Sequence, residues 1–271
     1  MIPIGDSVRS RSFPSVNIAI IALNVLVFFY ELTLGTVPDT FFRALPRLGI
    51  FSELDLFYFD WGTIPACLSD RFGFEPEVAP AVLETFCSES RRVTFSPFSS
   101  MFIHGGWFHL IGNMIFLWVF GDNVEDAMGH VRYAAFYVIA GLTATTAHVA
   151  IGPSDITPAI GASGAIAGVL GAYIVLYPRA TVAAILPIFI LFWMPFYVPA
   201  IVLIGVWFVL QLLNGVAALA TTDVVGAGGG VAWFAHIGGF VAGLVLVKLF
   251  VLGRSVPTVP RRARYRRPRG W

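Results

Sequence analysis

Charged residues are scarce in this chain. Only 12% of its 271 residues are Asp, Glu, Lys or Arg, whereas 57% are hydrophobic and the mean hydropathy is +0.80. A soluble globular domain carries about twice that charged fraction, so a soluble fold is excluded. Several runs approach or exceed the length of apolar helix that crosses a bilayer. The sequence therefore predicts an all-α, polytopic membrane protein.

Cysteine is also nearly absent, and the net charge is close to zero. The two cysteines, Cys67 and Cys87, both lie in the segment 35–99, where a disulfide and two free thiols are both open interpretations. The net charge of +1 hides six arginines in the last eleven residues, and nine acidic against five basic residues in 35–99. A near-neutral total gives no support for a nucleic-acid partner, and we expect none. The partner that the composition predicts is the lipid bilayer.

Hydrophobic runs divide the chain into six expected spans, at residues 16–34, 100–120, 131–151, 157–177, about 200–219 and 231–252. One membrane domain, 16–252, then lies between a tail at 1–15 and a basic tail at 253–271, and it includes a long loop at 35–99. The apolar stretch 182–220 is too long for one span, and Pro187, Pro195 and Pro199 interrupt it. We expect an interfacial or re-entrant piece before the fifth span.

Arginines set the expected orientation. If the chain crosses six times, one side of the membrane holds Arg9, Arg11, Arg132, Arg179 and the arginines of the tail. The positive-inside rule makes that side the cytoplasm. Both termini are then cytoplasmic and the loop 35–99 faces outward. The expected location is a prokaryotic cell membrane.

Two of the expected spans carry small residues at every fourth position. In 157–177 they include Gly164 and Gly168, and in 231–252 they include Gly239 and Gly243. Such stripes let two helices approach closely. The fourth and sixth spans are therefore expected to pack against each other.

Polar side chains interrupt three spans that run in the same direction. Ser163 and His236 each lie about six residues, or about 9 Å, inside the outer ends of their expected spans. His109 and Asn113 are four residues apart and so share a helix face. Polar groups inside a membrane are costly and usually face the protein interior. Close packing of the two small-residue stripes would bring His236 within hydrogen-bond reach of Ser163, as a base beside its nucleophile.

Three motifs occur in an order that resembles the rhomboid family of intramembrane serine proteases. They are HGGWFHLIGNM at 104–114, GASG at 161–164 and AHIGGFVAG at 235–243. The resemblance covers residues 95–252. It implies a six-helix, rhomboid-like bundle that cleaves transmembrane segments of membrane proteins near their outer ends, with no cofactor and no metal.

The resemblance also implies a role for each polar residue of the motifs. Ser163 would be the nucleophile and His236 the general base. His109 and Asn113, with the backbone N–H of Ser163, would bind the oxyanion. His104 would support the outer end of the second span, and the two glycines that flank the nucleophile, Gly161 and Gly164, are expected to support the site.

Two positions depart from the family pattern. A tyrosine four residues after the serine, which stacks on the histidine in well-studied members, is replaced by Ala167. Phe95-Ser96 stands where many members have Trp-Arg. The first departure leaves open what orients His236. No acidic residue lies in the second, fourth or sixth span, so we expect His236 to work without an acidic partner.

Three other functions were weighed against proteolysis. A transporter or channel would need repeated halves, and the sequence has no repeat. A zinc site of His104, His109 and His236 lacks the catalytic Glu of an HExxH metalloprotease. A catalytically inactive relative that binds transmembrane helices is the remaining alternative, although the chain retains both Ser163 and His236.

Overall fold

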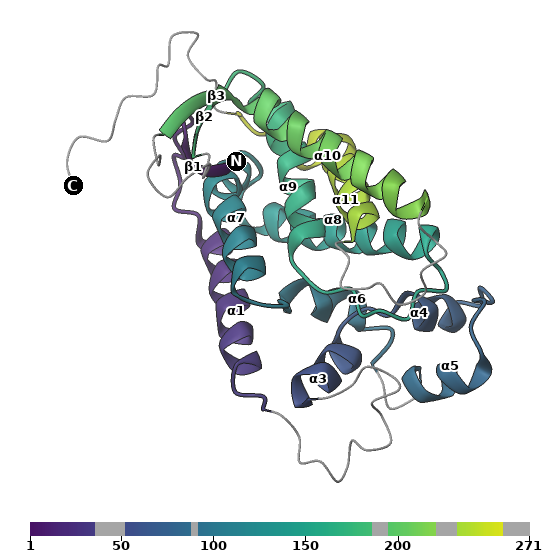
Figure 1. The fold of residues 1–271 in the computed structure, drawn as a ribbon. Helices are drawn as coiled ribbons and strands as arrows, with labels where there is room; N and C mark the ends of the chain where they lie inside the picture. Colours follow the sequence, from purple (N-terminus) through teal and green to yellow (C-terminus); the bar gives the residue numbers. More distant parts are fainter. Residues whose placement is uncertain (36–51, 88–91, 186–194, 221–231, 257–271) are drawn as a thin grey trace.

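The computed structural model of the protein describes residues 1–35, 52–87, 92–185, 195–220 and 232–256. Pro187 and most of the expected basic tail lie outside these ranges. The described chain is mostly helical, with one small sheet (Figure 1). Its elements are β1 (Ile2–Asp6), α1 (Ser15–Glu31), α3 (Glu53–Trp61), α4 (Pro65–Arg71), α5 (Pro80–Phe86), α6 (Ser96–Ser99), the 3-10 helix η2 (Ser100–Phe102), α7 (Trp107–Met128), α8 (His130–Ile151), α9 (Ser163–Leu176), β2 (Thr181–Ile185), β3 (Pro195–Pro199), α10 (Ala200–Ala220) and α11 (Trp233–Phe250).

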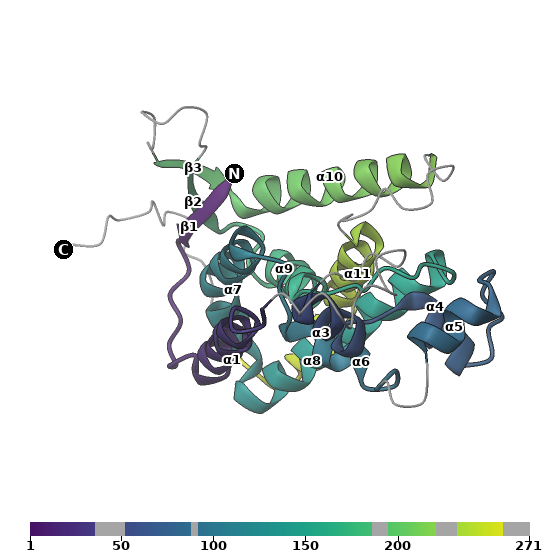
Figure 2. The ribbon, with the colours of Figure 1, turned by 60° about the horizontal axis from the view of Figure 1, so that its bottom comes forward.

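Helix α9 lies at the centre of the bundle. It contacts α7, α8 and α11, while α1 packs on α7 and α10 packs on α11 (Figures 1 and 2). Ten consecutive residues of α9, 164–173, are buried. A helix that is apolar and covered on every side belongs to the core of a bundle. The other helices are therefore arranged around the helix that begins with Ser163.

Fewer described helices are long enough to cross a membrane than the six spans that the sequence predicts. Among the described residues, α8, α10 and α11 are long and apolar enough to cross a membrane, and the bent pair α6–η2 with α7 can supply a fourth span. Helices α1 and α9 are apolar but shorter. The described chain thus supports a helical membrane protein with three or four candidate spans, and six spans stay a prediction.

The expected bounds of the second span and of the loop after it are wrong. We expected a span at 100–120 and a polar loop at 121–132. Instead, the chain bends by 92° between η2 and α7, and α7 continues to Met128, with only Gly129 before α8. The acidic residues of the expected loop are part of α7 because their side chains bind groups of the N-terminal segment. Glu125, for example, is buried and accepts the backbone N–H groups of Val16 and Asn17, at 3.0 and 2.7 Å, which satisfies free amides at the start of α1.

The expectation of an all-α fold is wrong for one region. Strands β1, β2 and β3 form an antiparallel sheet in that order. Strand β2 lies where an interfacial or re-entrant piece was expected, and its buried Val182 and Ala184 pack into the core. Strand β3 begins at Pro195 and ends at Pro199, and prolines suit the edge of a sheet. An apolar run alone does not distinguish a buried strand from a helix.

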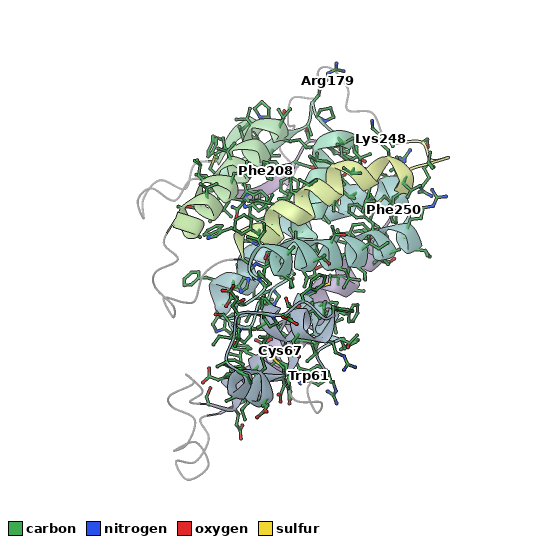
Figure 3. All side chains as sticks on the ribbon, turned by 90° about the vertical axis from the view of Figure 1, so that its right-hand side faces the viewer. Trp61, Cys67, Arg179, Phe208, Lys248 and Phe250 are labelled. Carbon is green, nitrogen blue, oxygen red and sulfur yellow. A yellow bond between two sulfur atoms is a disulfide. The ribbon has the colours of Figure 1, made fainter. Side chains whose placement is uncertain are left out.

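Short helices α3 to α6 cover the end of the bundle opposite the sheet (Figure 1). Cys67 and Cys87 are joined by a disulfide there, which decides between the two interpretations of the cysteines. The guanidinium of Arg92 lies 4.0 Å above the ring of Trp61. Figure 3 shows Trp61 and Cys67 at this end and Arg179, Lys248 and Phe250 toward the other.

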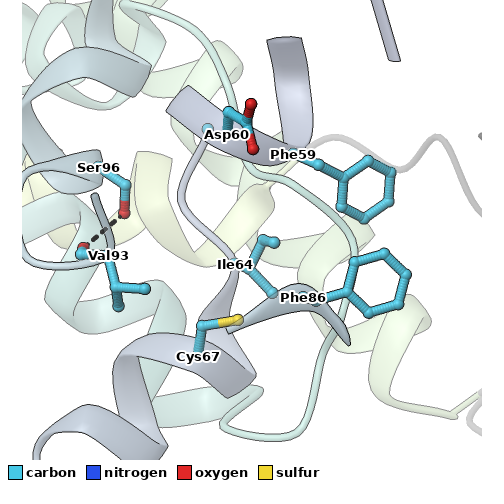
Figure 4. A pocket seen from close by; sticks show the side chains of 8 residues that line it. Phe59, Asp60, Ile64, Cys67, Phe86, Val93 and Ser96 are labelled. Carbon is cyan, nitrogen blue, oxygen red and sulfur yellow. Dashed lines mark hydrogen bonds between the residues drawn. The ribbon is translucent and has the colours of Figure 1, made fainter. Parts of the chain in front are cut away.

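This end has a small core of its own. The rings of Phe59 and Phe86 stack with centroids 4.8 Å apart, and Ile64 and Cys67 are buried beside them (Figure 4). A cavity of about 10 Å³ lies among these side chains, which is close to the least volume that holds one water molecule. Together with the disulfide, this core makes the α3–α5 region a packed unit rather than a loose loop.

Helices α9 and α11 touch backbone to backbone through glycine. A Cβ atom built on Gly239 would lie 2.0 Å from the carbonyl oxygen of Gly164, and one on Gly243 would lie 2.0 Å from that of Gly168. No side chain fits at such distances. The close approach expected from the small-residue stripes is therefore present, and these four residues are called the glycine seam below.

The glycine seam predicts that a side chain larger than that of Gly239 forces α9 and α11 apart. Gly239→Ala should lower the free energy of unfolding by about 1–3 kcal/mol, because the added methyl group pushes two backbones apart. Thermal unfolding in detergent would measure the loss. Gly205→Ala in α10 is the matched control, since a Cβ there meets nothing within 4 Å, and it should unfold at the same temperature or slightly higher. Equal destabilisation of both variants would contradict the seam.

Asp6, at the end of β1, makes stability depend on pH. Its carboxylate accepts hydrogen bonds from Asn123 Nδ2, at 3.0 Å, and from the hydroxyl of Tyr173. Burial raises the pKa of Asp6 to about 7, and the nearby Asp122 carboxylate adds to this rise, while the Tyr173 hydrogen bond opposes it. Because the folded-state pKa lies above the unfolded value of about 4, the proton bound by Asp6 stabilises the fold at low pH. That stabilisation is lost as the pH rises through 7.

We therefore expect the unfolding temperature of the wild type to fall between pH 5 and pH 8. Asp6→Asn, which cannot ionise, should show a smaller fall over the same range. Thermal unfolding of both proteins across a pH series provides the measurement. Parallel curves for the two proteins would show that Asp6 does not supply the pH dependence.

Candidate catalytic site

Ser163 and His236 meet at the starts of two adjacent helices. Ser163 is the first residue of α9, and His236 is the fourth residue of α11. Ser163 Oγ lies 2.7 Å from His236 Nε2, within hydrogen-bond distance. The expectation that both lie six residues inside their helices is wrong, because residues 157–162 are not helical and α11 begins at Trp233. Both side chains therefore occupy the first turn of their helices.

The segment before Ser163 is held in place by residues that lie far earlier in the chain. Thr63 and Ala159 exchange two backbone hydrogen bonds, of 3.0 and 2.7 Å, and the N–H of Gly161 donates to the carbonyl of Ser100 at 2.8 Å. Gly161 has φ +125°, a conformation open mainly to glycine. These contacts end the extended segment and let the helix begin at the serine.

Helix α10 supplies the second partner of His236. The Nδ1 atom of its ring lies 2.7 Å from Gln211 Oε1. The Trp207 ring lies 5.8 Å away from the imidazole between centroids, tilted by 38°, and the Trp233 ring meets it edge-on at 6.3 Å. Sequence reasoning missed Gln211 and Trp207. The signal that could have found Gln211 is an amide in an otherwise apolar run. A polar group inside a membrane is costly and usually has a partner.

His109 presents an N–H group beside the serine. The backbone N–H of Gly105 donates to His109 Nδ1 at 3.3 Å, so the neutral ring carries its proton on Nε2. A Cβ built on Gly161 would lie 2.7 Å from that Nε2 and 3.6 Å from Ser163 Oγ. The donor of His109 thus lies next to the backbone that precedes the serine.

Asn113 lies one helical turn after His109 on the same helix. Its side chain is 8% exposed, and its Nδ2 atom has no hydrogen-bond partner among the described residues. An unpaired buried donor is unfavourable unless a ligand or water satisfies it. Asn113 Nδ2 is therefore available to an acceptor that the described residues do not supply.

His104 lies just before α7 and not inside a continuous helix that begins at Ser100. It lies in the turn between η2 and α7 and is fully buried. Its backbone N–H donates to Glu31 Oε1 at 3.1 Å, and its carbonyl accepts from the Tyr58 hydroxyl at 3.2 Å. Its ring packs edge-on against that of His109, with centroids 5.0 Å apart. His104 thus joins α1 and α3 to the start of α7 and supports the ring of His109.

Two of the three imidazoles that could be zinc ligands have other hydrogen-bond partners. His236 is bonded to Ser163 and Gln211, and His109 accepts from Gly105. Within the ranges that the structure describes, no three His, Cys, Asp or Glu side chains are close enough to hold a metal ion.

A cavity of about 30 Å³ lies beside Ser163, between α8 and the segment before α9. Its lining includes the side chains of Ser100, Thr145 and His148. This volume holds about two water molecules. The site therefore has room for water next to the serine hydroxyl.

Comparison with known proteins identifies the family. The family model of the rhomboid domain matches residues 91–253, which is more than half of the chain. The chain belongs to the rhomboid family, as its motifs predicted. Members of this family are generally serine proteases.

Curated relatives agree with this assignment. RHOMBOID-like protein 5 of Arabidopsis thaliana is 39% identical over 27% of this chain and 24% of its own length. Rhomboid-like protease 5 of Toxoplasma gondii is 30% identical over 54% of this chain and 15% of its own length. Rhomboid protein 1, mitochondrial, of Saccharomyces cerevisiae is 26% identical over 88% of this chain and 64% of its own length. The chain covers less than two thirds of each relative.

The hydrogen bond between Ser163 and His236 predicts a reactive serine. A fluorophosphonate probe should label the wild type and should fail to label Ser163→Ala. His236→Ala should label at least tenfold more slowly, because the base that takes the serine proton is missing. Gel fluorescence after timed labelling provides the measurement. Labelling of Ser163→Ala at the wild-type rate would show that another residue reacts.

Proposed function

We propose that this chain is an intramembrane serine endopeptidase that cleaves transmembrane segments near their outer ends. The observation that carries the proposal is the 2.7 Å contact between Ser163 Oγ and His236 Nε2 at the starts of two packed helices. Membership of the rhomboid family and a relative named as a protease support it.

In the proposed reaction, Ser163 Oγ attacks a peptide carbonyl while His236 Nε2 takes its proton. The oxyanion that forms accepts hydrogen bonds from the backbone N–H of Ser163, from His109 Nε2–H and from Asn113 Nδ2, which has no other partner among the described residues. The start of α9 adds a favourable dipole. His236 then protonates the leaving amine, and water hydrolyses the acyl-enzyme.

The proposed orientation rests on charge and on the disulfide. Arg132 and Arg254 bind backbone carbonyls at the sheet-bearing end, those of Leu252 and Ala127, and Arg179 also lies toward that end (Figure 3). The disulfide lies at the opposite end. The positive-inside rule then assigns both described ends of the chain to the cytoplasmic side and the site to the outer side. The relatives named above are eukaryotic and one is called mitochondrial, which gives no support to the expected prokaryotic membrane.

The test is cleavage in a bilayer. The purified chain in lipid vesicles should cleave a single-span peptide that has small residues near its outer end, and Ser163→Ala and His236→Ala should not. Strong metal chelators should leave the rate unchanged. If the wild type binds the peptide as well as Ser163→Ala does and does not cut it, the inactive, helix-binding alternative would be established instead.

The same assay examines the oxyanion donors. Asn113→Ala should lower kcat by about a hundredfold, since an oxyanion donor acts mainly in the transition state. Its KM should change little. An unchanged kcat would remove Asn113 from the proposed oxyanion site.

A further inference from the structure

We propose that Gln211 is the positioning residue that fixes the tautomer of His236 and so completes an uncharged Ser–His–Gln chain. This inference rests on the proposed function, because it concerns the base of the same reaction. Gln211 lies on α10, is 6% exposed, and places Oε1 2.7 Å from His236 Nδ1. No acidic side chain of the described residues takes this place.

The second hydrogen bond of Gln211 fixes which end of its amide faces the histidine. Gln211 Nε2 lies 3.3 Å from the backbone carbonyl of Trp207, one turn earlier on α10. A carbonyl only accepts, so this end of the amide must be the NH₂ group. The oxygen therefore faces His236, and the bond between the two side chains needs a proton on Nδ1.

A proton on Nδ1 leaves Nε2 of the neutral ring unprotonated. Nε2 is the atom that lies 2.7 Å from Ser163 Oγ, and a general base must present a lone pair to the hydroxyl. The opposite tautomer would set the lone pair of Nδ1 against Gln211 Oε1, lose this bond, and offer the serine a donor instead of an acceptor. Gln211 thus selects the tautomer that can accept the serine proton.

Gln211 also limits how the ring can turn. The imidazole is held at Nδ1 by the amide and bordered by the rings of Trp207 and Trp233. In soluble triads a buried Asp holds the tautomer, and in papain-like proteases an amide does so. A neutral amide suits a site inside a membrane, where an isolated carboxylate is costly.

The first test examines the wild type alone. With ¹⁵N-labelled histidine, the resonances of His236, identified by their loss in His236→Ala, should show a protonated Nδ1 and an unprotonated Nε2 at neutral pH. A protonated Nε2 in the resting protein would overturn the proposal. This measurement needs no substrate, so it is informative even if proteolysis fails.

The second test removes the acceptor. Gln211→Leu keeps a similar volume and should lower kcat about tenfold or more with KM within about twofold, because base catalysis is lost while substrate binding is kept. Gln211→Glu, which retains an oxygen at the same reach, should recover at least part of the loss. Asn214→Leu removes an exposed amide from the same helix and should match the wild type.

Probe labelling of Ser163 separates the two hypotheses. If the wild type cleaves no peptide, the proposed function fails, but Gln211→Leu should still slow labelling and shift the His236 tautomer. If the wild type cleaves and Gln211→Leu is equally fast, with unchanged ¹⁵N resonances and an unchanged unfolding temperature, only the role of Gln211 is overturned. Slower turnover of Gln211→Leu with an unchanged His236 tautomer would also overturn the role of Gln211.

Discussion

The contact between α9 and α11 through glycine is the constraint on which the site depends. Gly239 and Gly243 meet the carbonyls of Gly164 and Gly168 with no room for a methyl group. Only at this separation do the first turns of the two helices bring a serine hydroxyl and an imidazole within 2.7 Å. Membrane helices gain little from the hydrophobic effect when they associate, so close van der Waals packing has to hold them. The same packing therefore stabilises the bundle and sets the distance between the reacting groups.

The site is built from neutral groups. Ser163, His236 and Gln211 form a chain of hydrogen bonds, and the acidic residues that the structure describes in the bundle serve other purposes. Glu31 accepts the N–H of His104, and Glu125 accepts amides at the start of α1. Glu31 is bonded by a backbone donor, and Glu125 by backbone donors and by His130 Nδ1; a buried charge is tolerated when it is paired and hydrogen-bonded. The resting site contains no such charge and needs no such compensation.

Much of this arrangement could be predicted from the sequence, and the exceptions have a common cause. The motifs around Ser163, His236 and Asn113, and the small-residue stripes, are local patterns that identify the helices and their contact. The start of α9 was misplaced because Thr63 and Ser100, far away in the chain, hold residues 159–161 in an extended form. The length of α7 was missed because its acidic residues find partners in the N-terminal segment, more than a hundred residues earlier. The role of Gln211 does not follow from the apolar run around it, because its partner His236 lies on another helix, 25 residues later. Long-range partners are what a single sequence does not display.

The order of the chain has a consequence for biogenesis. The nucleophile and its base are 73 residues apart, and the helix that carries Gln211 lies between them. Chains are synthesised from the N-terminus and fold largely in that order. The serine therefore enters the membrane well before the histidine, and the glycine seam closes only when α11 has docked. Until then a nascent chain has no His236 beside its serine, so the proposed enzyme remains inert while the helices from α1 to α10 are inserted.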